Sequence, residues 1–416
     1  MITIERKIEH KGDYEIIVCG GGVAGIAAAL QAARVGKKVM LIEKSQKLGG
    51  LATLGLINFF VPMCNGRGRQ IIFGMAEEFL RLSIKNGYDT IPENWQEPNS
   101  HARYCTTYSA EIFALELTKI LNDAGVTLMF DSLITDALYT DGVLEGVIIE
   151  NKSGKGYYTA KMFVEATGDC DLLRIIGVPT LKRGNFHTYL GKMVTLNSCK
   201  KVVDEQNIKH ALTCVSGGNI NLYGTNQPRD IALYDGTDAN EVNRYLINNQ
   251  LQMLNKIEND DRITRDIVTL PGMAQFRTTA CLDGKYVLKG EDSYRHFEDS
   301  IGAINDFDRN DYLYEMPYST LVRDDVKNII SVGRCASGEG WGWDVLRVIP
   351  PAIITGQAAG FAVANAIDEN TDIAKVDIKK LQKQLTDANV IIHFDDAWVP
   401  DVSDNRFLNI EQDANQ

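Results

Sequence analysis

The chain has 416 residues, of which 44% are hydrophobic and 24% are charged, a composition typical of folded globular proteins that excludes disordered and fibrous architectures. Acidic residues (55) outnumber basic residues (43), and the net charge of −12 argues against nucleic acid or an anionic membrane as the main partner. At about 150 residues per domain, the length indicates about two or three domains.

The eight cysteines form no CxxC pair and show no metal-ligand spacing, so we expect neither a metal site nor a disulfide framework. Buried thiols of this kind are typical of a reducing compartment, which favours a cytoplasmic location. The N-terminal residues lack the apolar segment of a signal peptide. The longest apolar stretch, residues 348–367, contains two prolines and two glycines and predicts a buried helix, not a membrane span.

Residues 15–43 contain the first motif. An apolar strand, a GGGVAG turn, an alanine-rich helix and a second apolar strand follow one another there. Gly20, Gly22 and Gly25 have GxGxxG spacing, and Glu43 ends the second strand. This is the strand–turn–helix–strand–acid unit of a dinucleotide-binding fold.

Each element of this unit has a physical reason. Gly20 permits the tight turn, Gly22 lets the backbone approach a pyrophosphate, and Gly25 lets the helix pack closely on the strand. The N-terminus of the helix offers N–H groups and a partial positive charge to the phosphates. The carboxylate of Glu43 accepts hydrogen bonds from ribose hydroxyls and repels a 2′-phosphate, which disfavours NADP.

This unit alone does not distinguish FAD from NAD, and the segments that follow favour FAD. The glycine pair at residues 49–50 suits a chain that runs close along an extended cofactor. Residues 161–165 predict a strand that ends in an Ala-Thr-Gly turn at residues 166–168. Residues 328–332 predict another strand that leads into Gly333. Small residues at these strand ends permit close approach to a ligand.

Together these segments resemble the glutathione-reductase-type FAD flavoproteins. Within them the chain is most similar to FAD-dependent oxidoreductases with the patterns GGGxAGxAAA…EK…LGG, ATGDxDL and GR…RVxPxxxxTGQAAG. The resemblance covers most of residues 14–370. It implies an α/β fold in which a Rossmann-like FAD-binding domain is assembled from discontinuous segments, residues 1–180 and 310–416. An inserted α+β substrate domain, residues 181–309, would lie between them.

The resemblance also implies the positions of the cofactor-binding residues. The pyrophosphate would lie over the glycine turn, Glu43 would bind the adenosine ribose, and the backbone of Ile134 would meet adenine. Many related flavoproteins have Gly-Asp where this chain has Gly333-Arg334, so the usual aspartate contact to ribitol is absent or is supplied elsewhere, for example by Asp344. The complete predicted set is Gly20, Gly22, Val23, Ala24, Gly25, Glu43, Lys44, Gly49, Gly50, Leu51, Ile134, Ala166, Thr167, Gly168, Gly333, Arg334, Pro351 and Ala352.

Pro350 and Pro351 suit the start of a helix, where N–H groups have no partners within the helix. The resemblance directs this helix N-terminus at the N1–C2=O edge of the flavin, where reduction places negative charge. The helix dipole, with Arg347 beside it, would stabilise that charge. The alternative is a buried alanine-rich helix preceded by a surface arginine.

The candidates for substrate chemistry are Arg347, His187 and Arg277. His187 opens the inserted region, where it is either a general base or a hydrogen-bonded structural histidine. Arg277 either holds a carboxylate or another polar group of the substrate, or forms a structural ion pair. His101 and His393 are weaker candidates.

The predicted function is that of an FAD-dependent oxidoreductase acting on a small polar substrate by hydride transfer to or from the flavin. Alcohol oxidation and reduction of a carbon–carbon double bond both fit. The chain has no second GxGxxG unit, so we expect no built-in NAD(P)H domain, while transient binding of NAD(P)H at the flavin face stays an alternative. The electron donor or acceptor is unidentified, and the absence of a CxxxxC pair argues against a disulfide reductase. A homo-oligomer is compatible with the sequence. The alternatives are a flavoprotein that uses FAD for non-redox chemistry and a non-catalytic flavin-binding subunit.

Overall fold

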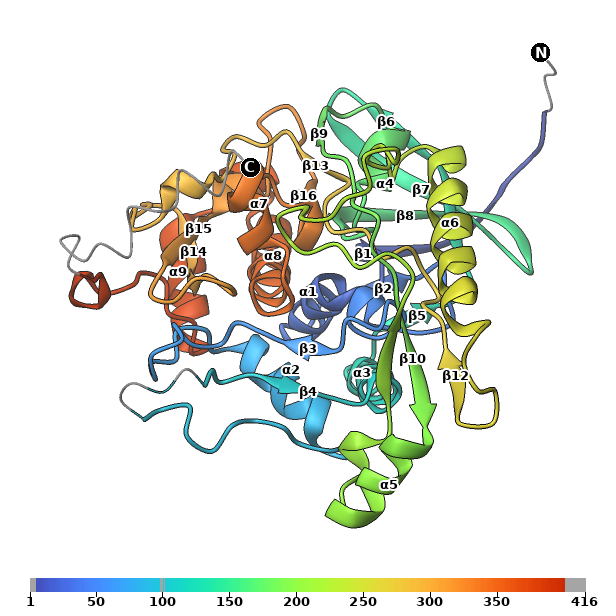
Figure 1. The fold of residues 1–416 in the computed structure, drawn as a ribbon. Coiled ribbons are helices and arrows are strands. Elements are labelled where there is room, and N and C mark those ends of the chain that lie inside the picture. Colours follow the sequence, from blue (N-terminus) through green and yellow to red (C-terminus); the bar gives the residue numbers. More distant parts are fainter. Residues whose placement is uncertain (1–4, 98–99, 101, 401–416) are drawn as a thin grey trace.

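The computed structural model describes residues 5–97, 100 and 102–400, so His101 lies outside the described residues. A seven-stranded sheet in the order β5-β2-β1-β8-β7-β6, with β16 paired to β8, forms its centre (Figure 1). The strands of this sheet are β1 (Glu9–Cys19), β2 (Val39–Ile42), β5 (Thr127–Met129), β6 (Leu133–Thr140), β7 (Val143–Asn151), β8 (Gly154–Glu165) and β16 (Ile329–Ser331). The helices are α1 (Val23–Arg34), α2 (Met75–Ile84), α3 (Ala110–Asp123), α4 (Asp171–Ile175), α5 (Leu196–Glu205), α6 (Ala239–Ile257), α7 (Gly340–Leu346), α8 (Ile349–Glu369) and α9 (Ile378–Asp387).

Strand β8 joins parts of the chain that are far apart in sequence. Its first half pairs with β7 in antiparallel fashion, and its second half pairs with β16 in parallel fashion, Phe163 opposite Ile329 and Glu165 opposite Ser331. Strand β1 runs parallel to β8 along the other edge. The sheet is therefore built from N-terminal and C-terminal segments, which confirms the prediction of a Rossmann-like domain assembled from discontinuous segments.

The parallel part of the sheet, made of β2, β16 and the second halves of β1 and β8, is buried on both faces, as expected for parallel strands. In β1, Ile16 and Val18 point into a core shared with α1 and α8, whereas Ile17 and Cys19 point into a separate core on the other face. Helices α1 and α8 lie side by side on the first face (Figure 1). A Cβ on Gly356 of α8 would lie 2.1 Å from the carbonyl oxygen of Ala24, so only glycine permits this close helix contact.

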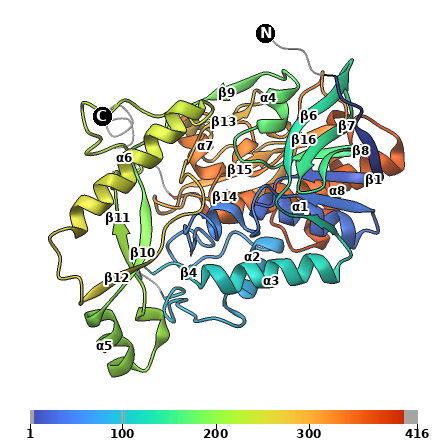
Figure 2. The ribbon, with the colours of Figure 1, turned by 90° about the vertical axis from the view of Figure 1, so that its right-hand side faces the viewer.

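Residues 180–282 contribute a second group of elements, of which α5, α6 and the strands β10, β11 and β12 lie to the left in Figure 2. A three-stranded sheet in the order β11-β10-β12 packs against α6, and its core contains Tyr189, Tyr234, Tyr245 and Phe276. The strands outside the central sheet are β3 (Phe59–Phe60), β4 (Thr106–Thr107), β9 (Thr180–Lys182), β10 (Leu190–Thr195), β11 (Thr213–Ser216), β12 (Arg265–Thr269), β13 (Ala280–Leu282), β14 (Ser300–Asn305) and β15 (Leu313–Pro317).

The limits predicted for the inserted domain, residues 181–309, stay a prediction. The pairing of two strands near residue 309 concerns these limits. Strands β14 and β15 form an antiparallel pair on either side of residues 309–310. Buried residues of both strands, Ile301 and Tyr314 among them, belong to the same core as α8. A boundary drawn before β14 would keep this pair within one unit.

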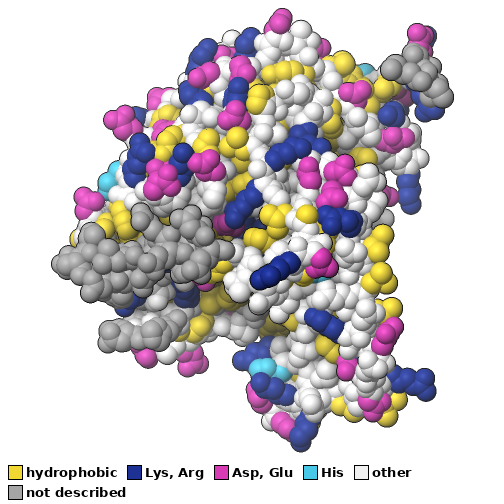
Figure 3. Space-filling view, turned by 45° about the horizontal axis from the view of Figure 1, so that its top comes forward, with side chains coloured by type: hydrophobic (Ala, Val, Ile, Leu, Met, Phe, Trp, Pro, Cys, Tyr) yellow, Lys and Arg dark blue, Asp and Glu magenta, His cyan; other side chains and the backbone are white. Residues whose placement is uncertain are grey.

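Among the described residues, no helix on its own has the length and apolar composition needed to cross a membrane. Helices α7 and α8 meet that test only as a pair, and they are bent by 75° at their junction. On the face drawn in Figure 3, acidic and basic side chains are interspersed. All eight cysteines are free thiols.

Candidate active site

A cavity of about 380 Å³ lies along the carboxyl ends of β1, β2, β8 and β16 and the N-termini of α1 and α8. Ligands of open α/β sheets bind at this edge. Every residue of the predicted cofactor-binding set lines the cavity, except Gly25 and Pro351. Lining residues that the sequence did not single out are Gly21, Ile42, Ser45, Ala52, Leu54, Ser132, Leu133, Asp171, Gly272, Met273, Val332 and Ile349.

The three glycines of the turn have three different environments. Gly20 has φ +115°, and a Cβ there would lie 2.3 Å from the carbonyl oxygen of Ala166, so this glycine keeps the turn against the end of β8. A Cβ on Gly25 would lie 2.1 Å from the carbonyl oxygen of Gly20. Glycine is therefore needed here for α1 to pack against the turn. A Cβ on Gly22 would meet nothing within 4 Å, because that space is the cavity. The turn therefore offers bare backbone to a ligand and fits a pyrophosphate.

Glu43 is held in place by two backbone amides. Its Oε2 accepts a hydrogen bond from the amide of Gly21 at 2.8 Å, and its Oε1 accepts one from the amide of Ser45 at 2.8 Å. A carboxylate has about four acceptor sites, so lone pairs remain for ribose hydroxyls. Ile134 lines the same cavity beside Ser132, whose amide donates to the carbonyl oxygen of Glu43. Glu43 and Ile134, the residues predicted to bind the ribose and the adenine, therefore line neighbouring parts of one cavity.

Arg347 lines the cavity with Ile349 and Ala352 of the first turn of α8. Its Nε lies 2.8 Å from Oδ1 of Asp344, while Oδ2 of Asp344 lies 2.7 Å from Arg183. Burial opposes ionisation of Asp344, but Arg347 and Arg183 lower its pKa below the ordinary value. Both oxygens of Asp344 are therefore engaged by arginines, and Asp344 lies outside the cavity lining, which argues against the suggested ribitol contact.

Arg277 lies near Arg347 but outside the lining of the cavity. Its guanidinium donates to the carbonyl oxygens of Asn221 at 2.8 Å and Ile220 at 3.1 Å. It forms no ion pair with any described residue, so the structural alternative of an ion pair does not hold. Burial, followed by the charge of Arg347, lowers the pKa of Arg277 to about 10.

His187 is not brought to the cavity. Its side chain is 1% exposed, with Nδ1 3.0 Å from the hydroxyl of Tyr234 and Nε2 2.6 Å from Oε1 of Gln252. Both ring nitrogens are therefore engaged inside the protein, and neither is positioned to take a proton from a substrate. This correction to the general-base hypothesis follows from packing of the segment between β9 and β10 against α6, which local sequence does not reveal.

Two buried charged residues lie at the ends of β16 and β8, where Arg334 lines the cavity and Glu165 does not. Arg334 pairs with Asp169 at 3.0 Å, and its carbonyl oxygen accepts a hydrogen bond from Nε1 of Trp343 at 3.0 Å. Glu165, fully buried at the end of β8, accepts hydrogen bonds from the amides of Thr167 and Leu172 at 2.7 and 2.9 Å. Burial raises the pKa of Glu165 to about 7. Sequence reasoning missed Glu165, although an acidic residue within an apolar strand was its signal.

The sheet, the glycine turn, the fixed carboxylate and the cavity along the strand ends define a dinucleotide-binding flavoprotein of the α/β class. The chain matches the model of the family described as FAD dependent oxidoreductase over residues 15–256 and 244–385. It therefore belongs to the FAD-dependent oxidoreductase family, is an enzyme of that class, and has FAD as its cofactor.

Individual curated relatives match much shorter parts of the chain than the family model does. A thioredoxin reductase of Ureaplasma parvum is 29% identical over 80 residues, which are 19% of this chain and 26% of that protein. A protein described as a bifunctional amine oxidase of Dictyostelium discoideum is 49% identical over 45 residues, 11% of this chain and 4% of that protein. The chain thus spans only a small part of these curated relatives.

Two solved structures cover nearly the whole chain at low identity. A geranylgeranyl bacteriochlorophyll reductase-like protein from Thermoplasma acidophilum is 16% identical, with 94% of this chain and 95% of that chain covered and a TM-score of 0.46. The p-nitrophenol 4-monooxygenase of Pseudomonas putida is 13% identical, with 93% and 91% covered and a TM-score of 0.48. With TM-scores this low, neither likeness bears on the reaction.

Replacing Gly22 with alanine is expected to weaken FAD binding while leaving the apoprotein folded. The backbone at Gly22 has φ −70°, which alanine adopts without strain, and the added methyl group meets no protein atom within 4 Å but enters the cavity. Crowding of this kind corresponds to about a tenfold or greater loss of FAD affinity, measured by flavin fluorescence titration. The control is Gly25→Ala, which should also lower the melting temperature of the apoprotein. Wild-type FAD affinity in Gly22→Ala would contradict the placement of the pyrophosphate.

The buried carboxyl of Glu165 predicts a pH-dependent stability. Its pKa of about 7 in the folded protein lies above the ordinary value of 4.5, so the folded state holds the proton more tightly. The corresponding contribution is lost as pH rises from about 4.5 to about 7 and amounts to about 3 kcal/mol.

We therefore expect the stability difference between wild type and Glu165→Gln to shrink by about 3 kcal/mol from about pH 5 to about pH 8, in denaturant unfolding. An amide does not ionise in this range, so the stability of the variant lacks this pH-dependent contribution. A difference that stays constant with pH would show that Glu165 is ionised throughout.

Proposed function

We propose that this FAD-dependent oxidoreductase transfers a hydride between the flavin and a small polar substrate that carries an anionic group. The observation that supports the proposal is an excess of positive charge beside the cavity. Arg183 and Arg347 share the single carboxylate of Asp344, and Arg277 lies near enough to Arg347 for the two charges to interact. Three guanidinium groups against one carboxylate leave a site suited to a substrate carboxylate or phosphate.

FAD, when bound, supplies the two-electron hydride chemistry. The residues of the chain would provide charge and position. Helix α8 begins at the cavity with Pro350 and Pro351 in its first turn and with no acidic residue there. The partial positive charge of this helix end and the guanidinium of Arg347 would stabilise negative charge that develops in the cavity. Arg277 would orient the anionic group of the substrate.

The proposal also covers the subgroup of flavoproteins, the type of reaction and the partners of the enzyme. The glycine turn, the Ala-Thr-Gly strand end and the α8 pattern support a relationship to glutathione-reductase-type flavoproteins. Alcohol oxidation and carbon–carbon double-bond reduction both fit the site. We further propose a cytoplasmic enzyme with a separate electron donor or acceptor, without nucleic-acid or membrane partners, that is compatible with homo-oligomer formation. Non-redox use of FAD and a non-catalytic flavin-binding role are the alternatives.

An anaerobic screen of metabolites against the flavin spectrum tests the proposal. We expect bleaching of the visible flavin band by acidic metabolites, or re-oxidation of the reduced flavin by acidic unsaturated acceptors, and no response to their neutral analogues. In Arg277→Met, KM for the acidic substrate should rise about tenfold or more because a charge-assisted hydrogen bond is lost. Arg277→Lys is the matched control and should restore part of the affinity. Bound FAD that no metabolite reduces or re-oxidises would favour the two alternatives.

Substitution of Arg347 with alanine is expected to lower the midpoint potential of the bound flavin. The variant removes a positive charge at the cavity and leaves Asp344 with one arginine partner instead of two. Both changes disfavour a negatively charged reduced flavin, and a decrease of about 30 mV corresponds to about 1.4 kcal/mol for a two-electron couple. Arg34→Ala, which removes an arginine paired with Glu78 at the far end of α1, is the control. An unchanged potential in Arg347→Ala would make Arg347 a purely structural residue.

A further inference from the structure

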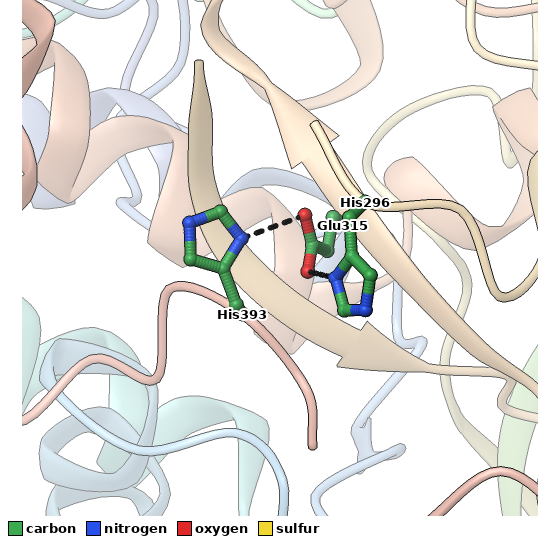
Figure 4. Close-up of side chains that lie close together, drawn as sticks. All are labelled: His296, Glu315 and His393. Carbon is green, nitrogen blue, oxygen red and sulfur yellow. Dashed lines mark hydrogen bonds and ion pairs between the residues drawn. The ribbon is translucent and has the colours of Figure 1, made fainter. Parts of the chain in front are cut away.

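A second group of polar side chains lies outside the lining of the flavin cavity, on β15 and the two segments beside it. Glu315 of β15 is 0% exposed, and its carboxylate lies between two histidines (Figure 4). Nδ1 of His296 lies 2.6 Å from Oε1 of Glu315, and Nδ1 of His393 lies 2.9 Å from Oε2. Three separate chain segments therefore bring two imidazole nitrogens to the two oxygens of one carboxylate.

The potential ligand atoms lie close enough together to hold a metal ion. One ligand atom from each of His296, Glu315 and His393 lies within 4.8 Å of the others. Zinc bonds of about 2.0–2.2 Å to nitrogen and oxygen place tetrahedral ligands about 3.4 Å apart, so small side-chain movements suffice. The histidine side chains are 42% and 43% exposed, which gives an ion a path from solvent and leaves room for water as a fourth ligand.

The surroundings of the three residues resemble the outer shell of a metal site. Nε2 of His296 lies 2.9 Å from a carboxylate oxygen of Asp396, and the ring of His296 stacks on Phe394 at 4.3 Å between centroids. The amide of Phe297 donates to Oε2 of Glu315 at 2.8 Å. Hydrogen bonds from a carboxylate to the second nitrogen of a histidine ligand, and from an amide to a ligating carboxylate, fix ligands in place.

The burial of Glu315 gives a further reason for a cation. A carboxylate removed from water is costly unless a positive partner compensates it. Among the described residues, Glu315 forms ion pairs only with His296 and His393. A divalent cation would supply the compensating charge permanently.

We propose that His296, Glu315 and His393 bind Zn²⁺. Two imidazole nitrogens and one carboxylate oxygen are a ligand set that zinc accepts in proteins. The ion would tie the C-terminal segment around His393 to β15 and to the loop that carries His296. The sequence predicted no metal because these ligands are separated by 19 and 78 positions, which no short motif contains.

The test uses the full chain with FAD bound, freed of metal by a chelator and titrated with Zn²⁺ by calorimetry, with metal content checked by mass spectrometry. We expect about one tight equivalent of zinc and a higher melting temperature in its presence. His296→Ala and His393→Ala should each weaken zinc binding about 100-fold or more, and Asp396→Asn about tenfold.

His10→Ala is the matched control, because His10 faces a carboxylate of Asp13 at 3.0 Å without a second histidine, and it should bind zinc as the wild type does. Flavin content should be equal in all variants, since none of these residues lines the flavin cavity. If His296→Ala does not fold, His393→Ala and Asp396→Asn provide the test. Absence of a tight equivalent, equal affinity in all variants, or tighter binding of Mn²⁺ or Fe²⁺ than of Zn²⁺ would overturn the proposal.

Discussion

The architecture depends on a set of backbone-to-backbone contacts that only glycine allows. Gly20 brings the first turn against Ala166 at the end of β8, Gly25 brings α1 against that turn, and Gly356 brings α8 against α1. Any side chain at these three positions would meet a carbonyl oxygen at 2.1–2.3 Å. Because the contacts are this close, the N-termini of α1 and α8 open onto one cavity, and the positive ends of both helices act on the same ligand.

A second constraint is electrostatic and links separate segments. Asp344 of α7 binds Arg347, which precedes α8, and Arg183, which follows β9. One buried carboxylate thus fixes the arginine that lines the cavity and connects it to the inserted segment. Arg277 lies near this pair and adds a positive charge that interacts with Arg347 and with Asp344. The electrostatics of the cavity is therefore set by long-range pairing as well as by the helix dipoles.

Much of the flavin-binding region was predictable because its signals are local. Strands β1, β2, β8 and β16 show short apolar runs that end in small residues, and the spacing of Gly20, Gly22 and Gly25 fixes the turn between β1 and α1. Helix α8 starts at Ile349, so Pro350 and Pro351 lie in its first turn, where prolines are tolerated.

The parts that failed depend on contacts between distant residues. The burial of His187 among Tyr234 and Gln252 comes from packing against α6, and no local pattern encodes it. The sharing of Asp344 by two arginines and the convergence of histidines on Glu315 also require the tertiary fold. Glu165 was predictable in part. Its apolar neighbours in the sequence indicate that it is buried, but they do not indicate which backbone amides donate hydrogen bonds to it.

The pairing of β8 with β16 has a consequence for biosynthesis. A nascent chain acquires β1, β2 and β8 early, but the position beside the second half of β8 stays vacant until residues 329–331 leave the ribosome. Until then a row of unsatisfied peptide groups is open to pairing with other chains. Residues 329–331 therefore complete this part of the sheet late in translation, and the uncovered edge of β8 is where a partly synthesised chain is open to mispairing.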